Sequence, residues 1–217
     1  MLGKYQTLYK KDIKEVGGLI APDEEFRKAK GIRSVYVSNY GRVISKRVGK
    51  PRLLKSHFSN GYHSITVENG TKRKCYFVHI LVAKAFVEVP DWINKDDRKE
   101  VHHITKVDRK CETENSHHVN NLCWLPPKIH RLVDKIEEVA VNIDGQYVPM
   151  DFVKVAEYYG ISPYVLAKAV GNVWKKPPTT QDDNIYYYQM PLEDGDNKVN
   201  IDIRIVRPQD EHVSRTT

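Results

Sequence analysis

The sequence predicts an α+β protein: a small β-rich module comes first, a strand–strand–helix unit follows, and a helix pair and a β-hairpin come last. Between positions 35 and 78, short runs of β-branched and aromatic residues alternate with turn residues. Apolar residues then recur at helical spacing from Val78 and again after Pro127. Residues 199–205 alternate strictly between apolar and polar, which is typical of a strand with one buried face.

The first thirty residues mix charges without a clear period. They predict only a short helix near residues 23–30, which Gly31 would end. The β-rich module follows this segment. Its first hairpin has Val35–Val37 and Arg42–Ile44 on either side of the turn-rich tetrad Ser38–Gly41.

A second hairpin and a helix complete this module. Alternating or β-favouring residues flank Asn69-Gly70, the strongest two-residue hairpin signal. From Val78 the period becomes helical, and Pro90 prevents continuation. We therefore place the module at residues 31–90.

The next unit, residues 91–137, is predicted to contain two strands and a helix. The strands are expected at Val101–Ile104 and Asn121–Leu125. Pro126-Pro127 marks the start of the helix, because proline at the first helical position needs no amide donor.

Two more segments complete the chain. Residues 138–176 predict a hairpin around Asp144-Gly145 and then two short helices, the second capped by Ser162. Residues 177–217 predict a β-hairpin to which the sequence assigns no role.

The charge is concentrated at the front of the chain. The net charge is +7, but residues 1–60 carry 14 basic and 5 acidic side chains, a balance of +9, whereas residues 136–217 carry 8 and 13, a balance of −5. A basic front half suits a polyanion partner, because each neutralised phosphate releases counterions. From charge alone, a nucleic-acid-binding surface and an ordinary solvated surface are equally good interpretations. The candidate DNA-binding residues are Arg42, Lys46, Arg47, Lys50, Arg52, Lys55 and Lys168.

Other classes of protein are excluded. The longest nearly apolar stretch, residues 76–87, is interrupted by His79 and Lys84 and falls short of the roughly 18 residues that a membrane span needs. The N-terminus has no apolar stretch typical of a secretory signal. The three cysteines form no CxxC pair, which excludes a four-cysteine zinc site. We expect a cytoplasmic protein without a membrane partner.

The densest chemistry lies in a histidine-rich region. Adjacent histidines on a strand point to opposite faces, so one of His102 and His103 can bind a metal while the other handles a proton. His130, a turn inside the predicted helix, can supply a second ligand, and Asn121 lies on the strand between. The alternatives are that His102 and His130 are surface histidines that bind no metal, and that Asn121 only forms a turn. His79 is interpreted as a core histidine.

These residues resemble the HNH, or ββα-metal, endonucleases of the phage and intron-encoded homing type. The matching motifs are His102-His103-Ile104, then Asn121-Leu122-Cys123-Trp124, then His130 nine positions after Asn121. Upstream, residues 35–43 and 78–86 look like the NUMOD4 module that precedes such cores. Residues 138–176 are similar to the helix-turn-helix modules that end these enzymes.

The resemblance implies a metal-dependent endonuclease that hydrolyses phosphodiester bonds in duplex DNA, either a nicking or a homing enzyme. It implies that His103 is the general base and that Asn121 orients the His103 loop through its backbone. His102 and His130 would hold one divalent ion, Mg²⁺ in the first place, with Mn²⁺, Ni²⁺ or Zn²⁺ as alternatives. The resemblance further implies double-stranded DNA as partner and a phage-encoded protein in a bacterial host, for which we favour a monomer.

Two departures from the family leave an alternative open. The spacing from His103 to Asn121 is several residues longer than usual, and His102 stands where homing members often have aspartate. With the acidic C-terminal third and the tail at residues 177–217, these departures would also suit a catalytically inactive HNH scaffold that binds DNA or serves as a virion-associated structural protein.

Overall fold

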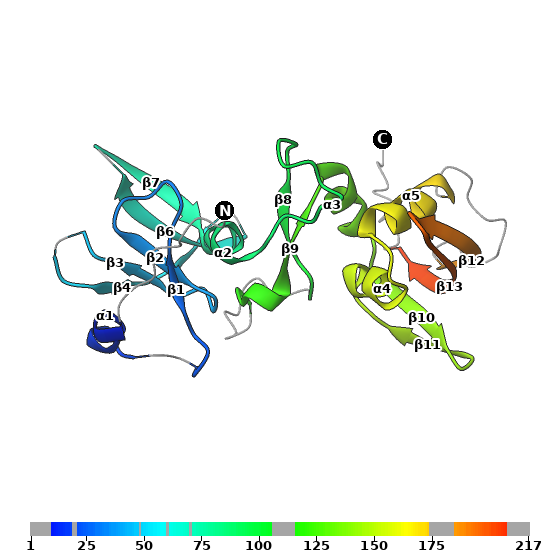
Figure 1. The fold of residues 1–217 in the computed structure, drawn as a ribbon, viewed down its shortest axis with the longest axis horizontal. Helices are drawn as coiled ribbons and strands as arrows, with labels where there is room; N and C mark the ends of the chain where they lie inside the picture. The colour runs from blue at the N-terminus through cyan, green and yellow to red at the C-terminus, as the bar shows by residue number, and fades with distance from the viewer. Residues whose placement is uncertain are drawn as a thin grey trace, which may run out of the picture. The chain divides into compact units, whose positions relative to one another are not determined.

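The computed structural model describes residues 10–18, 21–47, 49–59, 61–69, 71–105, 116–173 and 185–207 (Figure 1). The chain divides into two compact units. The N-terminal unit contains residues 1–90 and 101–124, and the C-terminal unit contains residues 91–100 and 125–217. Both mix helices with antiparallel sheets, which confirms the predicted α+β class.

Two small antiparallel sheets form most of the N-terminal unit. The predicted hairpins are present: β2 pairs with β3, and β6 pairs with β7. The elements are α1 (Lys10–Glu15), the sheet β1 (Phe26–Lys28), β2 (Val35–Ser38), β3 (Val43–Ser45) and β4 (Arg52–Leu54), the sheet β5 (His57–Ser59), β6 (Tyr62–Asn69) and β7 (Lys72–Phe77), and α2 (Val78–Phe86).

The helix predicted near residues 23–30 is wrong. Phe26–Lys28 forms strand β1, in which Phe26 pairs with Ser38 of β2. The side chain of Phe26 is buried and packs with Ile13 and Ile44 in a core cluster. Burial against the sheet therefore decides the conformation of a segment whose local pattern is ambiguous.

Helix α2 forms where the helical period predicted it. Its apolar face, with Val78, Leu81, Val82 and Ala85, is buried. The helix ends at Phe86. The indole N–H of Trp124 donates to the carbonyl of Val87 at 3.1 Å, and the Trp124 side chain is buried.

Strands β8 (Glu100–His103) and β9 (Leu122–Leu125) form a two-stranded sheet. A 3₁₀ turn, η1 (Val119–Asn121), leads directly into β9, and helix α3 (Pro127–Val133) follows it. The order of elements is therefore the predicted strand, strand and helix. Of the lengthened connection between the two strands, residues 106–115 lie outside the described residues.

A four-stranded sheet organises the C-terminal unit. Strand β13 pairs with both β10 and β12, so the terminal hairpin shares one sheet with the preceding segment. Ile201, Ile203 and Ile205 are buried at alternate positions, as predicted. The elements in sheet order are β11 (Gln146–Pro149), β10 (Glu138–Ile143), β13 (Asn197–Val206) and β12 (Ile185–Asp194), with helices α4 (Phe152–Tyr158) and α5 (Pro163–Val173). Helix α3 packs against α5.

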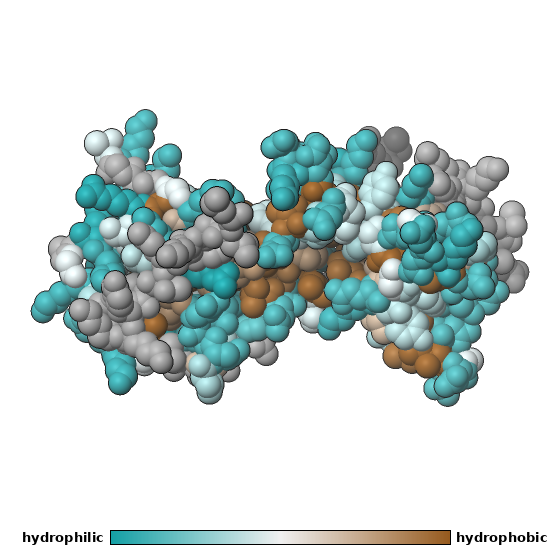
Figure 2. Space-filling model, viewed as in Figure 1, coloured by the Kyte–Doolittle hydropathy of each residue, from teal (hydrophilic) through white to brown (hydrophobic). Residues whose placement is uncertain are grey.

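Most exposed strand residues of the N-terminal unit are polar, and Leu53 of β4 and Phe58 of β5 are exposed apolar residues. Figure 2 shows hydrophilic residues over the region of β3, β4 and β7. In the described ranges, no helix is both long enough and apolar enough to cross a membrane.

Candidate active site

His102 and His103 are adjacent on strand β8. The alternation of a strand directs their side chains to opposite faces. His102 is buried, with 8% of its surface exposed, and His103 is half-buried. The two imidazoles therefore have different surroundings, as their sequence positions predicted.

Asn121 bonds to the backbone that follows His103. Its side-chain Oδ1 accepts a hydrogen bond from the N–H of Thr105 at 2.7 Å, and its carbonyl accepts one from the N–H of Ile104 at 2.9 Å. Its amide Nδ2 lies 3.5 Å from the carbonyl oxygen of Ser116. One side chain thus bonds to both ends of the long connection.

His130 on α3 is oriented by a carboxylate. Its Nδ1 lies 3.0 Å from Oε2 of Glu100. Since an ionised carboxylate can only accept, Nδ1 carries the proton and Nε2 is left with its lone pair. The hydrogen bond from His130, with a smaller effect of the Arg98 guanidinium, lowers the pKa of Glu100 against the opposing effect of burial. Nε2 of His130 lies 3.8 Å from Oδ1 of Asp134, one helical turn further on.

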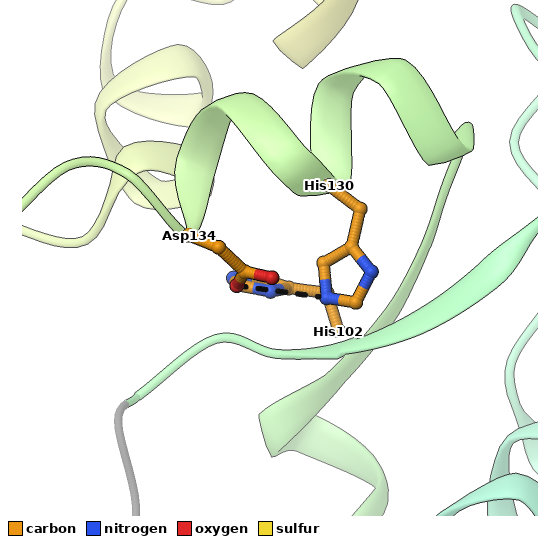
Figure 3. A group of neighbouring side chains, drawn as sticks. All are labelled: His102, His130 and Asp134. Carbon is orange, nitrogen blue, oxygen red and sulfur yellow. Dashed lines mark ion pairs between the residues drawn. The ribbon is translucent and has the colours of Figure 1, made fainter.

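Three side chains lie close enough together to hold one metal ion: His102, His130 and Asp134 (Figure 3). Each offers one ligand atom, and these atoms lie within 4.8 Å of one another. Two imidazoles and one carboxylate fit a divalent ion such as Mn²⁺ or Zn²⁺, and the carboxylate also suits Mg²⁺. The donor set therefore fits the ion that the sequence led us to expect.

Sequence reasoning missed Asp134 and Glu100. The signal for Asp134 was its position four residues after His130, since positions i and i+4 share one face of a helix. Glu100 offered no comparable signal, because its hydrogen bond joins residues thirty positions apart.

A cluster of rings surrounds His103. The ring centroid of His79 lies 4.9 Å from that of His103, His117 lies at 6.1 Å, and Tyr62 stacks at 6.4 Å. His79 is buried on α2, as expected of a core histidine. Burial, and then the neighbouring His103 and His63, lower the pKa of His117 to about 4. The His117 imidazole is therefore neutral at physiological pH.

The candidate DNA-binding residues occupy different environments. Arg42 forms an internal ion pair, donating to both carboxylate oxygens of Glu24 at 2.9 and 2.7 Å. Arg47 pairs with Glu68 where both side chains are about half exposed. Lys46 is half-buried, whereas Lys50, Arg52, Lys55 and Lys168 are exposed. Strand β7 adds exposed cations that sequence reasoning missed, namely Lys72, Arg73 and Lys74.

Comparisons with known proteins found one family model and one solved structure that this chain resembles. Residues 24–68 match the family model of the NUMOD4 motif, which confirms the NUMOD4-like module. Among solved structures, the chain is similar to the HNH homing endonuclease I-HmuI, whose structure is described under the heading of DNA binding and cleavage. The two chains are 24% identical, the match covers 68% of this chain and 90% of that one, and the TM-score is 0.38. The comparison with curated proteins found no match.

Proposed function

We propose that this chain is a metal-dependent HNH-type endonuclease that hydrolyses phosphodiester bonds in duplex DNA, either as a nicking or as a homing enzyme. One observation carries the proposal. Asn121 bonds to the backbone that follows His103. His102, the residue just before His103, lies with His130 and Asp134 in the group that can hold a metal ion. A proton acceptor and a metal-binding group are thus adjacent, which is what phosphodiester hydrolysis requires of a protein.

His103 acts as the general base in this proposal. A neutral imidazole can take a proton from the attacking water, and an ordinary imidazole is mostly neutral at physiological pH. Asn121 is a positioning residue, because its bonds end at Ile104 and Thr105 rather than at a reacting atom.

His102, His130 and Asp134 would hold the divalent ion. Glu100 orients His130 through Nδ1, so that Nε2 is available as the ligand atom. A bound divalent ion would stabilise negative charge on the phosphoryl oxygens and on the leaving oxygen. We propose Mg²⁺ or Mn²⁺ as the ion, and the two imidazoles also admit Ni²⁺ or Zn²⁺.

DNA contact is assigned to the exposed and half-buried cations of the N-terminal unit. The NUMOD4 match covers the cations between residues 46 and 55 and ends before β7. Arg47 also donates to the carbonyl of Glu68 in β6, so the β3–β4 connection and the β6–β7 hairpin lie together. Arg42 is held by Glu24 and is assigned an internal role instead. The proposed phosphate contacts are Lys46, Arg47, Lys50, Arg52 and Lys55, with Lys72, Arg73 and Lys74 added from the structure.

The helix pair α4–α5 is proposed as a second DNA contact through Lys168, which is exposed on α5. Each phosphate neutralised should add about −0.9 to the slope of log affinity against log salt. Lys168→Ala should therefore reduce that slope if the contact exists, whereas an unchanged slope would remove Lys168 from the DNA surface.

Cleavage of supercoiled plasmid by the wild type, His103→Ala and His57→Ala tests the proposed base. His57 is the matched control, because it is an exposed histidine of the same unit on β5. With Mg²⁺ or Mn²⁺ present, His103→Ala should cleave about 10² to 10⁴ times more slowly and bind DNA like the wild type. Equal rates for the wild type and His103→Ala would remove His103 from the mechanism. DNA binding without cleavage in the wild type would favour the inactive scaffold.

A further inference from the structure

The turn between β2 and β3 contacts the segment that ends in Asn121. The N–H of Val119 donates to the carbonyl of Asn39 at 2.8 Å. The ring of Tyr40 meets the ring of His118 edge-on, with centroids 4.4 Å apart. Both contacts lie within the N-terminal unit and join the NUMOD4 motif to the strand–strand connection of the candidate active site.

Gly41 permits the closest approach in this contact. A Cβ on Gly41 would lie 2.6 Å from Cβ of His117, well inside the roughly 3.5 Å at which carbon atoms make favourable contact. Gly41 also has a φ of +89°, which a side chain would make costly. Because Gly41 has no side chain, buried His117 can lie directly against the turn.

The side chain of Asn39 is fixed by hydrogen bonds to the backbone of an earlier segment. Its Oδ1 accepts from the N–H of Glu25 at 2.9 Å, and its Nδ2 donates to the carbonyl of Asp23 at 3.1 Å. Only 8% of its surface is exposed. The carbonyl that accepts from the Val119 N–H therefore belongs to a residue whose side chain is fixed by two hydrogen bonds.

The contact continues to the general base. Residues 117–119 lie against the turn, η1 connects them to Asn121, and Asn121 bonds to the two residues after His103. A short series of hydrogen bonds and packed rings thus runs from the NUMOD4 turn to the backbone that follows His103.

We propose that the turn Ser38–Gly41 positions His103 for catalysis, with Asn39 and Gly41 as positioning residues that act through His117, Val119 and Asn121. The proposal rests on the proposed function, in which His103 is the base. The NUMOD4 motif then completes the active site in addition to its assigned contact with DNA. It also explains how the longer connection before Asn121 is compatible with an ordered site, because the turn holds its C-terminal end.

The test compares two glycine variants of the full chain. Gly41→Ala adds a Cβ against His117, whereas Gly31→Ala, the control, adds one at φ +78° with nothing within 4 Å. Both variants carry a similar backbone penalty, so their difference reports the His117 contact. Gly41→Ala should lower kcat at saturating DNA by about 10- to 100-fold, the effect of a small displacement of a reacting group, and should leave the Kd for DNA unchanged. Gly31→Ala should keep the wild-type kcat.

Rescue separates positioning from general damage. His117→Gly removes the atom that the new Cβ would meet, so Gly41→Ala with His117→Gly should recover much of the kcat lost in Gly41→Ala. Val119→Pro removes the N–H that bonds to Asn39 and fits the backbone there, since proline is tolerated at the first position of a helical turn. It should also lower kcat at unchanged Kd, and it decides the question if Gly41→Ala fails to fold.

A signal that does not depend on cleavage is the NMR resonance of the His103 imidazole. It should shift in Gly41→Ala and stay in place in Gly31→Ala. Equal kcat values and an unmoved resonance in Gly41→Ala would overturn the proposal, as would a weaker Kd at unchanged kcat, which would make the turn a DNA contact. If the wild type cleaves no DNA with any divalent ion, the proposed function fails and the positioning role falls with it.

Discussion

Replacing Arg42 by alanine should destabilise the N-terminal unit far more than it weakens DNA binding. The Glu24 side chain is fully buried, that of Arg42 is 16% exposed, and two hydrogen bonds join them. Removing one partner of such a pair leaves a buried charge and costs about 3–5 kcal/mol. For a unit of this size, that lowers Tm by roughly 10–20 °C.

Arg47→Ala is the matched control. Its ion pair with Glu68 is about half exposed on both sides, so its loss should cost less than about 1 kcal/mol. Urea unfolding followed by circular dichroism gives the two free energies, and fluorescence anisotropy with labelled duplex DNA gives the two affinities. The reasoning is refuted if Arg42→Ala loses less than about 1 kcal/mol and weakens DNA binding more than Arg47→Ala does.

Three further predictions concern stability and positioning. The pKa of His117 falls from 6.5 to about 4 on folding, so its contribution to stability should be complete above pH 6.5. The free energy of unfolding should decline by up to about 3 kcal/mol as the pH falls to 4. Urea midpoints should show this decline in the wild type and a smaller decline in His117→Gln. Burial raises the pKa of Asp151, the cap of α4, from 3.8 to about 6, so stability should fall as the pH rises from 4 to 6. Asp151→Asn should therefore raise the free energy of unfolding at pH 8 by at most about 3 kcal/mol, measured from the urea midpoint. Asn121→Ala removes the acceptor of the Thr105 N–H and should lower kcat by about 100-fold at unchanged Kd for DNA, while Asn121→Asp, which keeps the acceptor, should lose less.

Each of these predictions has a clear contrary outcome. Equal pH dependence in His117→Gln would assign the acid sensitivity to other groups. An unchanged midpoint for Asp151→Asn at pH 8 would mean that the carboxylate is solvated. A kcat for Asn121→Ala equal to that of the wild type would mean that the Asn121 bonds have no bearing on the chemistry.

Local spacing was enough to predict much of the candidate site. The adjacent pair His102-His103 on a strand and the helical His130 follow from periods of two and 3.6 residues, which the sequence displays directly. Asn121, expected at the start of a strand, ends the turn η1 just before β9. The bonds from Asn121 to the main chain after His103 agree with the role inferred for it.

The features that sequence reasoning missed depend on contacts between distant segments. Strand β1 exists because Phe26 is buried against β2, and β13 joins β10 across most of the C-terminal unit. Glu100 orients His130 across thirty positions. No local pattern displays these pairings.

Contacts between distant segments also decide which parts of the chain fold together. The sequence interpretation treated the strand–strand–helix unit and the segments after residue 138 as separable. In the structure, α3 packs against α5, and β13 completes the sheet of β10. Removing the C-terminal segment would therefore also remove the packing of the helix that carries His130.

The dependence of plasmid cleavage on Mn²⁺ concentration tests the central claim most directly, in the wild type, Asp134→Asn and the control Glu137→Gln, an exposed carboxylate just beyond α3. The wild type should cleave with Mn²⁺ and stop when the ion is chelated. Asp134→Asn should need a much higher Mn²⁺ concentration for half-maximal rate, because it loses one ligand of the His102, His130 and Asp134 group, and Glu137→Gln should match the wild type. Cleavage that persists under chelation, or equal Mn²⁺ midpoints for Asp134→Asn and the wild type, would contradict the account.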